Sequence, residues 1–327
     1  MLDSYQRDIN YLRVSVTDRC NLRCRYCMPE EGVKNLGHYI ILSLEEMARL
    51  IKIATAVGIR KVRFTGGEPL VRKNIGQLIR YTADIAGIDD IAITTNGLLY
   101  PAMAKELKAA GLKRINISLD TLSDTKYHYI TRRGDLKKAM EAVFKALELE
   151  MHPVKINTVI IKGFNDNEIM AFARLAYEYP LHLRFIEFMP IGDLRYWKPE
   201  RMLSVSEVKK QVEKEYELQI DKTVKGNGPA KSYRLVGGKG TLGFISPMSN
   251  HFCGECNRIR MTADGKLRGC LYDKREIDLK KAMASGASDE ELELLFRKAI
   301  TNKPKQHHMM NNGWGNENKR KMFQIGG

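Results

Sequence analysis

The stretch Asp18-Arg19-Cys20-Asn21-Leu22-Arg23-Cys24-Arg25-Tyr26-Cys27-Met28-Pro29 places three cysteines in one polar loop, spaced C-x3-C-x2-C, just after a short apolar segment. Thiolates are soft ligands that prefer zinc, copper(I) or iron–sulfur clusters. A closed zinc site or an ordinary four-iron cluster takes four protein ligands, so three cysteines leave one coordination position open for a substrate or cofactor. A zinc site completed by a distant ligand and three free thiols in the core are the alternatives that the spacing leaves open.

A second group of three cysteines, Cys253, Cys256 and Cys270, has the spacing C-x2-C-x13-C. The pair Asp264-Gly265 is typical of a tight turn, which would fold Cys270 back toward the other two. Half of a zinc ribbon, with His251 as the nearby candidate for a fourth ligand, is the alternative to an open iron–sulfur site. All six cysteines of the chain lie in these two groups, which in a reducing compartment favours metal binding over disulfides.

Short runs rich in Val, Ile and Phe recur along the first part of the chain, and each is followed by a helical pattern. They cover residues 12–16, 62–65, 91–94, 115–119, 154–161 and 183–188. Near-continuous apolar strands that alternate with amphipathic helices predict a parallel sheet covered by helices. Six β/α units are fewer than the eight of a complete barrel. We therefore predict an α/β fold, an incomplete (β/α)6 TIM-like barrel whose gap another part of the chain covers.

After the sixth unit the β/α rhythm stops. A capping box at Ser204 predicts one more helix over residues 204–216. The run Gly237-Gly238-Lys239-Gly240-Thr241 lacks the Gly-Lys-Ser/Thr end of a P-loop and predicts a hairpin turn. Residues 301–321 are polar and rich in Asn, so we expect a mobile tail with His307-His308 in solvent. The expected domains are a barrel at 1–200, a C-terminal domain that closes it at 201–300, and the tail at 301–327.

Composition restricts the class of protein. Lysine and arginine total 54 residues against 39 aspartates and glutamates, a net charge of +15. This excess implies an anionic partner such as nucleic acid, an acidic membrane face or a phosphorylated small molecule. The sequence has neither a signal-peptide core at its start nor an apolar run of about 18 residues, so we expect a cytoplasmic protein with no membrane partner. It also lacks the G-x-S-x-G motif of serine hydrolases.

The first cysteine motif, with the aromatic Tyr26 before its last cysteine, resembles the signature of the radical S-adenosylmethionine (SAM) enzymes. In these enzymes SAM binds the open iron of a [4Fe–4S] cluster. The second motif continues into Asn257-Arg258-Ile259-Arg260, and the chain ends in Ile325-Gly326-Gly327; together they resemble the GTP 3′,8-cyclase family of molybdenum cofactor biosynthesis. This resemblance extends over essentially the whole chain. It implies two [4Fe–4S] clusters, held by Cys20, Cys24 and Cys27 and by Cys253, Cys256 and Cys270.

The resemblance also implies the site residues, through positions that match the family's motifs. SAM would contact Tyr26, Gly67, Glu68, Ser118 and Met189. GTP would contact Arg13, Arg63, Thr94, Lys155, Arg258, Ile259 and Arg260, with Arg184 as a weaker candidate. Arg258, Arg260, Gly326 and Gly327 would take part in catalysis. Physical chemistry is consistent with these roles, because barrel active sites lie at the carboxyl ends of strands and arginine binds phosphate in a bidentate manner.

The implied enzyme cyclises GTP to (8S)-3′,8-cyclo-7,8-dihydroguanosine 5′-triphosphate. Its implied partners are a reduced flavodoxin- or ferredoxin-type electron donor, a second copy in a homodimer, and cyclic pyranopterin monophosphate synthase downstream; no nucleic acid is expected. Two other interpretations are a radical SAM peptide maturase with an auxiliary cluster and a basic zinc-containing nucleic-acid-binding protein. The Arg-x-Arg after Cys256 and the Gly-Gly end disfavour the first, and six β/α units disfavour the second.

Overall fold

One twisted sheet organises the molecule. The computed structural model describes residues 1–33, 39–192, 194–221, 223, 229–307 and 320–326. The sheet has 12 strands in the order β12-β11-β10-β1-β2-β3-β4-β5-β6-β9-β8-β7. The strands of the first half are β1 (Tyr11–Ser15), β2 (Lys61–Thr65), β3 (Asp90–Thr95), β4 (Arg114–Ser118), β5 (Val154–Ile160) and β6 (Leu181–Glu187). Those of the second half are β7 (Leu218–Ile220), β8 (Lys231–Leu235), β9 (Thr241–Ile245), β10 (Arg258–Met261), β11 (Lys266–Arg268) and β12 (Ile277–Asp278).

The six predicted strands are confirmed as β1 to β6, each parallel to the next. The second half of the chain then extends this core at both edges, since β10 pairs in parallel with β1 and β9 in parallel with β6. The parallel part of the sheet therefore has two more strands than the sequence predicted. Within the described residues no pairing joins β9 to β10, so the barrel is open, as expected.

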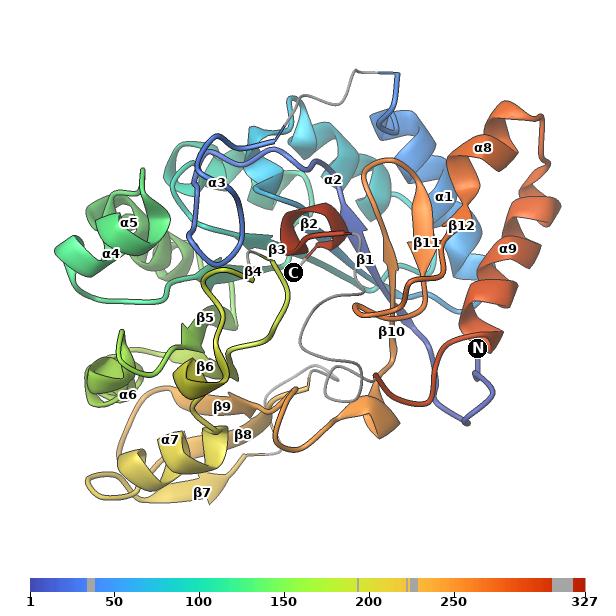
Figure 1. Cartoon of the computed structure of the whole chain (residues 1–327). Helices are drawn as coiled ribbons and strands as arrows, with labels where there is room; N and C mark the ends of the chain where they lie inside the picture. The colour runs from blue at the N-terminus through green and yellow to red at the C-terminus, as the bar shows by residue number, and fades with distance from the viewer. Residues whose placement is uncertain (34–38, 193, 222, 224–228, 308–319, 327) are drawn as a thin grey trace.

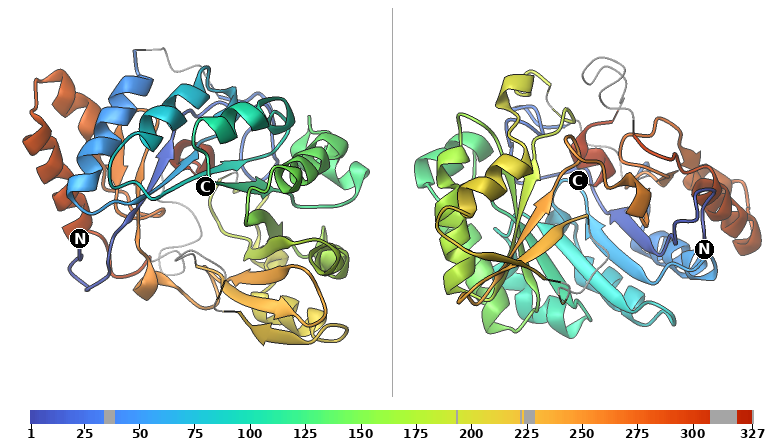
Figure 2. Two further views of the ribbon diagram at one scale, coloured as in Figure 1. Left: turned by 180° about the vertical axis from the view of Figure 1, so that it is seen from behind. Right: turned by 90° about the horizontal axis from the view of Figure 1, so that it is seen from below.

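Helices cover the outer face of the sheet, with one exception. The helices of the described residues are α1 (Leu44–Ala56), α2 (Ile75–Ala83), α3 (Tyr100–Ala109), α4 (Asp124–Thr131), α5 (Leu136–Glu148), α6 (Ile169–Glu178), α7 (Val205–Val212), α8 (Leu279–Ala284), α9 (Asp289–Thr301) and the exception, α10 (Met322–Ile325). Seen from behind, α1 to α3 lie across the outside of the strands (Figure 2). In contrast, α10 lies inside the curve of the sheet, near the ends of β1 to β4 (Figure 1). The polypeptide thus places its own C-terminal helix where the barrel is hollow.

Local sequence explains these elements. Ser43 and Glu46 form a capping box at the start of α1, and Ser204 and Glu207 form another at α7, as predicted. The helix α7 ends at Val212, earlier than the predicted residue 216. Both predicted turns are confirmed, because β8 and β9 form an antiparallel hairpin across residues 237–240 and β10 and β11 form one across Asp264-Gly265. No helix among the described residues is long and apolar enough to cross a bilayer.

A buried carboxylate connects the two halves of the chain. Glu187 at the end of β6 is 1% exposed. It accepts backbone hydrogen bonds from Val205 at 3.1 Å and from Met248 and Ser249 at 2.9 Å. Because a buried carboxylate is stable only when its oxygens are satisfied, this contact fixes β6 to the segments that follow it. The boundaries expected at residues 200 and 300 stay predictions.

The expectation of a solvated segment after residue 301 is wrong for Lys303 and His307, whereas Thr301, Asn302, Lys305 and Gln306 are exposed as expected; the mobility of the tail stays a prediction. Lys303 is 3% exposed. The half-buried ring of His307 packs edge-on against His251 with centroids 4.3 Å apart, and each ring has a nitrogen in hydrogen-bond contact with the Pro247 carbonyl. Long-range contacts to the C-terminal half hold this segment, and composition does not reveal such contacts. His308 and residues 309–319 lie outside the described residues.

Candidate active site

All six cysteines line a single cavity inside the curve of the sheet. The cavity is bounded by Thr65, Thr95 and Ser118, the last residues of β2, β3 and β4. It therefore lies at the carboxyl ends of parallel strands, where active sites of barrel folds are found. None of the cysteines forms a disulfide. We refer to Cys20, Cys24 and Cys27 as the first trio and to Cys253, Cys256 and Cys270 as the second trio.

The loop of the first trio is held by backbone and amide hydrogen bonds. The backbone N–H of Leu22 donates to the Cys20 sulfur at 3.3 Å, and the side-chain amide of Asn96 lies 3.9 Å from the same sulfur. The N–H of Cys27 donates to the Cys24 carbonyl at 2.9 Å, which forms the turn between these two ligands. A tight loop of this kind presents three sulfurs to one centre without regular secondary structure.

Burial dominates the electrostatics of the first trio. Burial, followed by the nearby Glu68 carboxylate, raises the pKa of Cys20 to about 11. Burial and the Cys20 thiol raise the pKa of Cys27 to about 12. The pKa of Cys24 is raised well above its ordinary value by burial and by the other two thiols. These thiols would lose their protons only when a metal centre binds, because its positive charge stabilises the thiolates.

The motif Gly66-Gly67-Glu68 packs against the start of this loop. A Cβ atom on Gly67 would collide with the Arg19 carbonyl, and the N–H of Glu68 donates to that carbonyl at 2.8 Å. The Glu68 carboxylate accepts 2.7 Å hydrogen bonds from the Thr95 hydroxyl and the Asn96 N–H, and burial raises its pKa to about 7. The glycine thus permits close approach of two protein segments. Gly67 borders the cavity, whereas Glu68 lies just behind the wall.

The other predicted SAM contacts converge on the same wall. Tyr26, Ser118 and Met189 all line the cavity. The Tyr26 hydroxyl donates to Asp120 at 2.6 Å, and its ring packs edge-on against Phe188 with centroids 6.1 Å apart. Burial raises the pKa of Asp120 to about 6. Sequence reasoning missed Asp120, because a carboxylate two residues beyond a strand resembles ordinary turn chemistry.

The second trio has cationic neighbours. Lys303 Nζ lies 3.4 Å and the Arg258 guanidinium 3.6 Å from the Cys256 sulfur. Burial would raise the pKa of Cys256, but these two cations outweigh burial and lower it to about 6. At Cys253 burial prevails and raises the pKa. Lys303 was missed because an isolated lysine after a helix carries no sequence signal.

The number of thiols bears on the kind of metal centre. Each trio supplies three cysteines, and all six are free and line the cavity. A mononuclear zinc site needs all of its ligands within one tetrahedron, whereas a four-iron cluster binds sulfurs that stand further apart around a cube. The donor set of three thiols at each site therefore fits an iron–sulfur cluster with one open iron.

A row of arginines crosses the floor of the cavity. In the sheet register Arg260 of β10 lies beside Arg13 of β1, which lies beside Arg63 of β2. Burial, and then Arg260 and Arg63, lower the pKa of Arg13 well below its ordinary value. Burial, and then Arg258, lower the pKa of Arg260 to about 9. Several buried cations this close together are costly unless an anion lies among them.

Further cations extend this row along the inside of the sheet. Burial and Arg184 lower the pKa of Lys155 to about 6, and burial and Arg63 lower that of Arg184 to about 9. The Arg184 guanidinium donates to Asn116 at 2.9 Å. Within the described part of the chain, the Nε atoms of Arg63 and Arg184 have no hydrogen-bond partner. Donors left over in this way suit a polyanionic ligand such as a triphosphate.

The C-terminal helix and the glycine after it contact the first trio and the row of arginines. The backbone N–H of Phe323 is directed at the Cys27 thiol, and the Arg260 guanidinium donates to the Gly326 carbonyl. Gly326 has a φ of +70°, and a Cβ atom there would collide with Thr65. Glycine is therefore needed at this position for the tail to enter the cavity. Gly327 lies outside the described residues.

The structure brings most of the predicted site residues together. Those that line the cavity are Arg13, Cys20, Cys24, Tyr26, Cys27, Arg63, Gly67, Thr94, Ser118, Met189, Cys253, Cys256, Arg258, Arg260 and Cys270. Lys155 and Glu68 lie buried behind this lining. The side chain of Ile259 packs in the hydrophobic core on the opposite face of β10 from its arginine neighbours, so only its backbone faces a ligand.

Comparisons with known proteins agree with this geometry. A family model described as Radical SAM superfamily matches residues 14–176, and one described as Molybdenum Cofactor Synthesis C matches residues 181–309. The GTP 3′,8-cyclase of Syntrophomonas wolfei is 67% identical over 327 residues, with 100% of both chains covered. That of Moorella thermoacetica is 53% identical over the same length and coverage. The chain belongs to the GTP 3′,8-cyclase family. It is thus a radical SAM enzyme, and the cofactors of this chemistry are SAM and iron–sulfur clusters.

Solved structures agree with the GTP 3′,8-cyclase assignment at the level of the fold. SuiB of Streptococcus suis, solved with its precursor peptide SuiA, has a TM-score of 0.56 and 15% identity, over 84% of this chain and 64% of SuiB. Methylornithine synthase has a TM-score of 0.51 and 17% identity, over 63% of each chain. At such identities only the TIM-like radical SAM fold is shared. The peptide that SuiB binds therefore gives no support to the peptide-maturase interpretation.

Proposed function

We propose that this enzyme cyclises GTP to (8S)-3′,8-cyclo-7,8-dihydroguanosine 5′-triphosphate in the first step of molybdenum cofactor biosynthesis. The observation that carries the proposal is one cavity that combines two groups of three cysteines with a row of buried arginines. Neither feature alone distinguishes among radical SAM enzymes, but the combination supports two open metal centres and a polyanionic substrate in one site.

The first trio would hold the [4Fe–4S] cluster that binds SAM. When bound, cluster and SAM would supply the radical chemistry for taking the hydrogen from C3′ of the GTP ribose and joining C3′ to C8 of guanine, with the electrons for SAM cleavage and for the dihydro product coming from an external reductant and a proton from solvent. Tyr26, Gly67, Ser118 and Met189 border the place for SAM. Glu68 supports this wall from behind through its bonds to Thr95 and Asn96. The role of these residues is to orient SAM and to exclude water from a reactive intermediate.

The second trio would hold a [4Fe–4S] cluster whose open iron accepts the guanine base. Arg13, Arg63, Lys155, Arg258 and Arg260 would neutralise the triphosphate. Arginine suits this purpose because its planar donors bind two phosphate oxygens at once. Thr94 borders the same cavity and offers a hydroxyl, and the backbone of Ile259 offers polar groups between the two arginines.

The C-terminal tail would complete the catalytic wall. Gly326 already accepts a hydrogen bond from Arg260 beside the row of arginines. With Gly327 it would adjust the position of Arg258 and Arg260 against the substrate. Because the tail also touches Cys27 through the Phe323 N–H, it is placed to close the cavity between the two metal centres.

Further parts of the proposal concern partners and organisation. A reduced flavodoxin- or ferredoxin-type protein would deliver the electron, and cyclic pyranopterin monophosphate synthase would use the product. We further propose a cytoplasmic homodimer that acts without a nucleic-acid or membrane partner. Residues 1–200 would form the radical SAM domain, residues 201–300 the domain of the second cluster, and residues 301–327 the tail.

The decisive experiment is a reaction with anaerobically reconstituted protein. It should contain about eight irons per chain, as expected for two four-iron clusters. Incubated with dithionite, SAM and GTP, it should yield 5′-deoxyadenosine and the cyclised nucleotide in near-equal amounts by mass spectrometry. Replacing GTP by ATP is the matched control and should leave no cyclised product. Colourless protein with bound zinc, or 5′-deoxyadenosine unaffected by GTP with no cyclised nucleotide, would contradict the proposal.

A further inference from the structure

The segment that follows α9 crosses directly over the second trio. Lys303, the second residue after this helix, is 3% exposed. Its ammonium donates to the Gly269 carbonyl at 2.7 Å, to the Arg258 carbonyl at 2.9 Å and to the Cys256 sulfur at 3.4 Å. An ammonium has three protons, and here each has an acceptor. Nothing in the proposed reaction uses this lysine.

The three acceptors come from two separate stretches of chain. Arg258 follows Cys256, whereas Gly269 immediately precedes Cys270. Lys303 therefore links the part of the second trio that precedes β10, Cys253 and Cys256, with Cys270, which follows β11. The link needs close approach, because a Cβ atom on Gly269 would lie 3.2 Å from the Lys303 Cα and would press the two segments apart.

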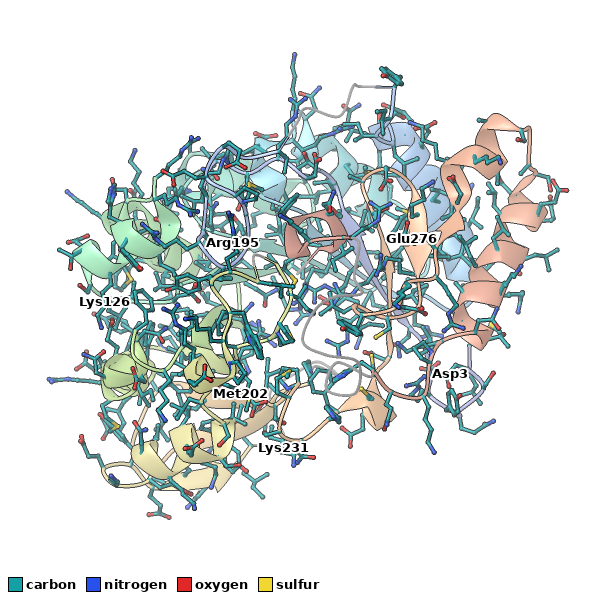
Figure 3. The ribbon with its side chains drawn as sticks, in the orientation of Figure 1. Asp3, Lys126, Arg195, Met202, Lys231 and Glu276 are labelled. Carbon is teal, nitrogen blue, oxygen red and sulfur yellow. The ribbon has the colours of Figure 1, made fainter. Side chains whose placement is uncertain are left out.

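A second buried cation holds the same segment through backbone atoms alone. Arg7 donates to the Cys253 carbonyl at 2.8 Å, to the Pro304 carbonyl at 2.8 Å and to the Lys305 carbonyl at 3.0 Å. Its charge is balanced by Asp3, which is labelled near the N-terminus in Figure 3. Arg7 thus supports the backbone around the second trio and, within the described part of the chain, has no hydrogen bond to a sulfur, which makes it a suitable comparison for Lys303.

A buried ammonium beside a ligand sulfur has an electrostatic consequence. Taking a lysine charge out of water is costly unless it is paired with negative charge and hydrogen-bonded. Two carbonyls supply only dipoles, so the Cys256 thiolate is the negative partner. Hydrogen bonds and positive charge at the sulfurs of an iron–sulfur cluster favour its more negative, reduced state.

We infer that Lys303 is a positioning residue for the second cluster: its ammonium holds the two cysteine-bearing segments at cluster spacing and stabilises negative charge at the Cys256 sulfur. The inference rests on the proposed function, in that the second trio must bind an iron–sulfur cluster. It adds a residue that is outside the motif and that controls both assembly and redox properties of that cluster.

The test compares Lys303→Met, Lys303→Arg and Arg7→Met with the unaltered chain, all reconstituted anaerobically without SAM or GTP. Iron content and electron paramagnetic resonance during a redox titration report each cluster separately. In Lys303→Met the ratio of reduced to oxidised second cluster should fall about tenfold at a given potential, equivalent to about 59 mV for one electron. The first cluster should be unchanged. Lys303→Arg keeps the positive charge, so its second cluster should have nearly the same potential as in the unaltered chain.

Arg7→Met should reduce occupancy of the second cluster without shifting its potential, since Arg7 supports only backbone. If Lys303→Met loses the second cluster alone, with the first intact, the positioning role is supported directly. Three outcomes would overturn the inference. Lys303→Met could keep a fully occupied second cluster with an unshifted potential, or lose both clusters. Arg7→Met could shift the potential of the second cluster as much as Lys303→Met does. Absence of a second cluster from the unaltered chain would instead overturn the proposed function.

Discussion

The two cysteine trios of this molecule share one cavity but differ in their electrostatic surroundings. Burial raises the pKa of Cys20 to about 11 and that of Cys27 to about 12, and the nearby charged groups include the carboxylates of Glu68 and Asp120. In the second trio, Arg258 and Lys303 lower the pKa of Cys256 to about 6. The same ligand type therefore sits in an acidic, desolvated environment at one site and a cationic environment at the other.

This difference shows how the surroundings of two clusters of the same kind can suit them to two different tasks. At the first trio, burial and nearby carboxylates outweigh the cations Arg23 and Lys321, and a cluster in such surroundings resists gaining negative charge and, once reduced, gives its electron away readily. Such a site suits reductive cleavage of SAM. A cluster beside arginine and lysine retains electron density and lies next to cations that attract phosphate. Such a site suits substrate binding. The following changes would break or sharpen this contrast.

The largest effect is expected from removing one ligand from each trio in turn. Cys27→Ala should abolish formation of both 5′-deoxyadenosine and cyclised nucleotide, because no cluster would remain to cleave SAM. Cys270→Ala should abolish cyclisation but leave measurable 5′-deoxyadenosine, since the first trio is intact. Both variants should retain about four irons per chain. Mass spectrometry of the two products checks this, and loss of 5′-deoxyadenosine in Cys270→Ala would refute the division of tasks.

A smaller effect is expected at the centre of the row of arginines. Arg13→Met removes the cation between Arg260 and Arg63. A hydrogen bond to a charged group contributes about 1.5–3 kcal/mol, so KM for GTP should rise roughly 10- to 100-fold. KM for SAM should not change. Arg80→Met removes an exposed charge in the last turn of α2 and serves as the matched control. Equal effects of both variants would point to net charge rather than to a local contact.

The C-terminal tail enters the cavity that the two trios share. Removing the ion pairs that hold it should have a smaller effect on activity than the previous change. Arg320 bonds both oxygens of Asp264, at 3.0 and 2.8 Å, and both of Glu276, at 2.6 and 2.9 Å; Glu276 is labelled beside β11 in Figure 3. Arg320→Met should release α10 and lower kcat about tenfold, the result of losing about 1.4 kcal/mol of positioning. Proteolysis near the C-terminus should accelerate.

The control for that variant is Arg297→Met, which removes an exposed ion pair with Glu293 on α9. Exposed pairs contribute little to stability, so activity and proteolysis should stay within error. If Arg320→Met behaved like this control, the tail would not depend on the half-buried ion pairs of Arg320.

The smallest effect concerns Lys155. Burial and Arg184 lower its pKa from 10.5 to about 6, so at pH 8 the side chain is neutral in the folded protein but charged in the unfolded chain. The unfolded chain then binds the extra proton between about pH 6 and 10.5, and this group makes stability rise with pH across that window. A bound triphosphate would restore the charge, so GTP binding at pH 8 should take up about one proton. Calorimetry of GTP binding in two buffers of different ionisation enthalpy measures this proton uptake.

Two variants separate this explanation from others. Lys155→Met cannot take up the proton, and Lys155→Arg is charged before GTP binds. Both should bind GTP without the buffer-dependent heat. A proton uptake that persisted in both would locate the titration elsewhere in the cavity.

Much of the barrel was predictable because its signal is local. The strands β1 to β6 have five to seven residues with several buried apolar side chains, and each is followed along the chain by a helix. The strand β10 has the same alternation of basic and apolar residues as β2, but it has only four residues and another strand follows it instead of a helix. Its pairing with β1 depends on contacts across more than two hundred residues, which composition does not encode.

The candidate site was predictable as far as its motifs extend. The six cysteines and the arginines stand in short patterns, whereas Lys303, Asp120 and His307 act through single long-range contacts. A lone lysine or histidine in a polar stretch is indistinguishable from a solvated one, which explains the wrong expectation for His307. The two glycines Gly67 and Gly326 were singled out by motif, but the segments they approach are known only from the fold.

The position of β9 and β10 at opposite edges of the parallel core has a consequence for biogenesis. During synthesis the six N-terminal strands leave the ribosome first, with their two outermost backbones unpaired until residues beyond 240 emerge. Bare edges of this kind invite association between nascent chains. Slow translation or scarce chaperones should therefore harm this protein before any iron is inserted, and its yield in a heterologous host should depend on growth temperature at least as strongly as on sulfide supply.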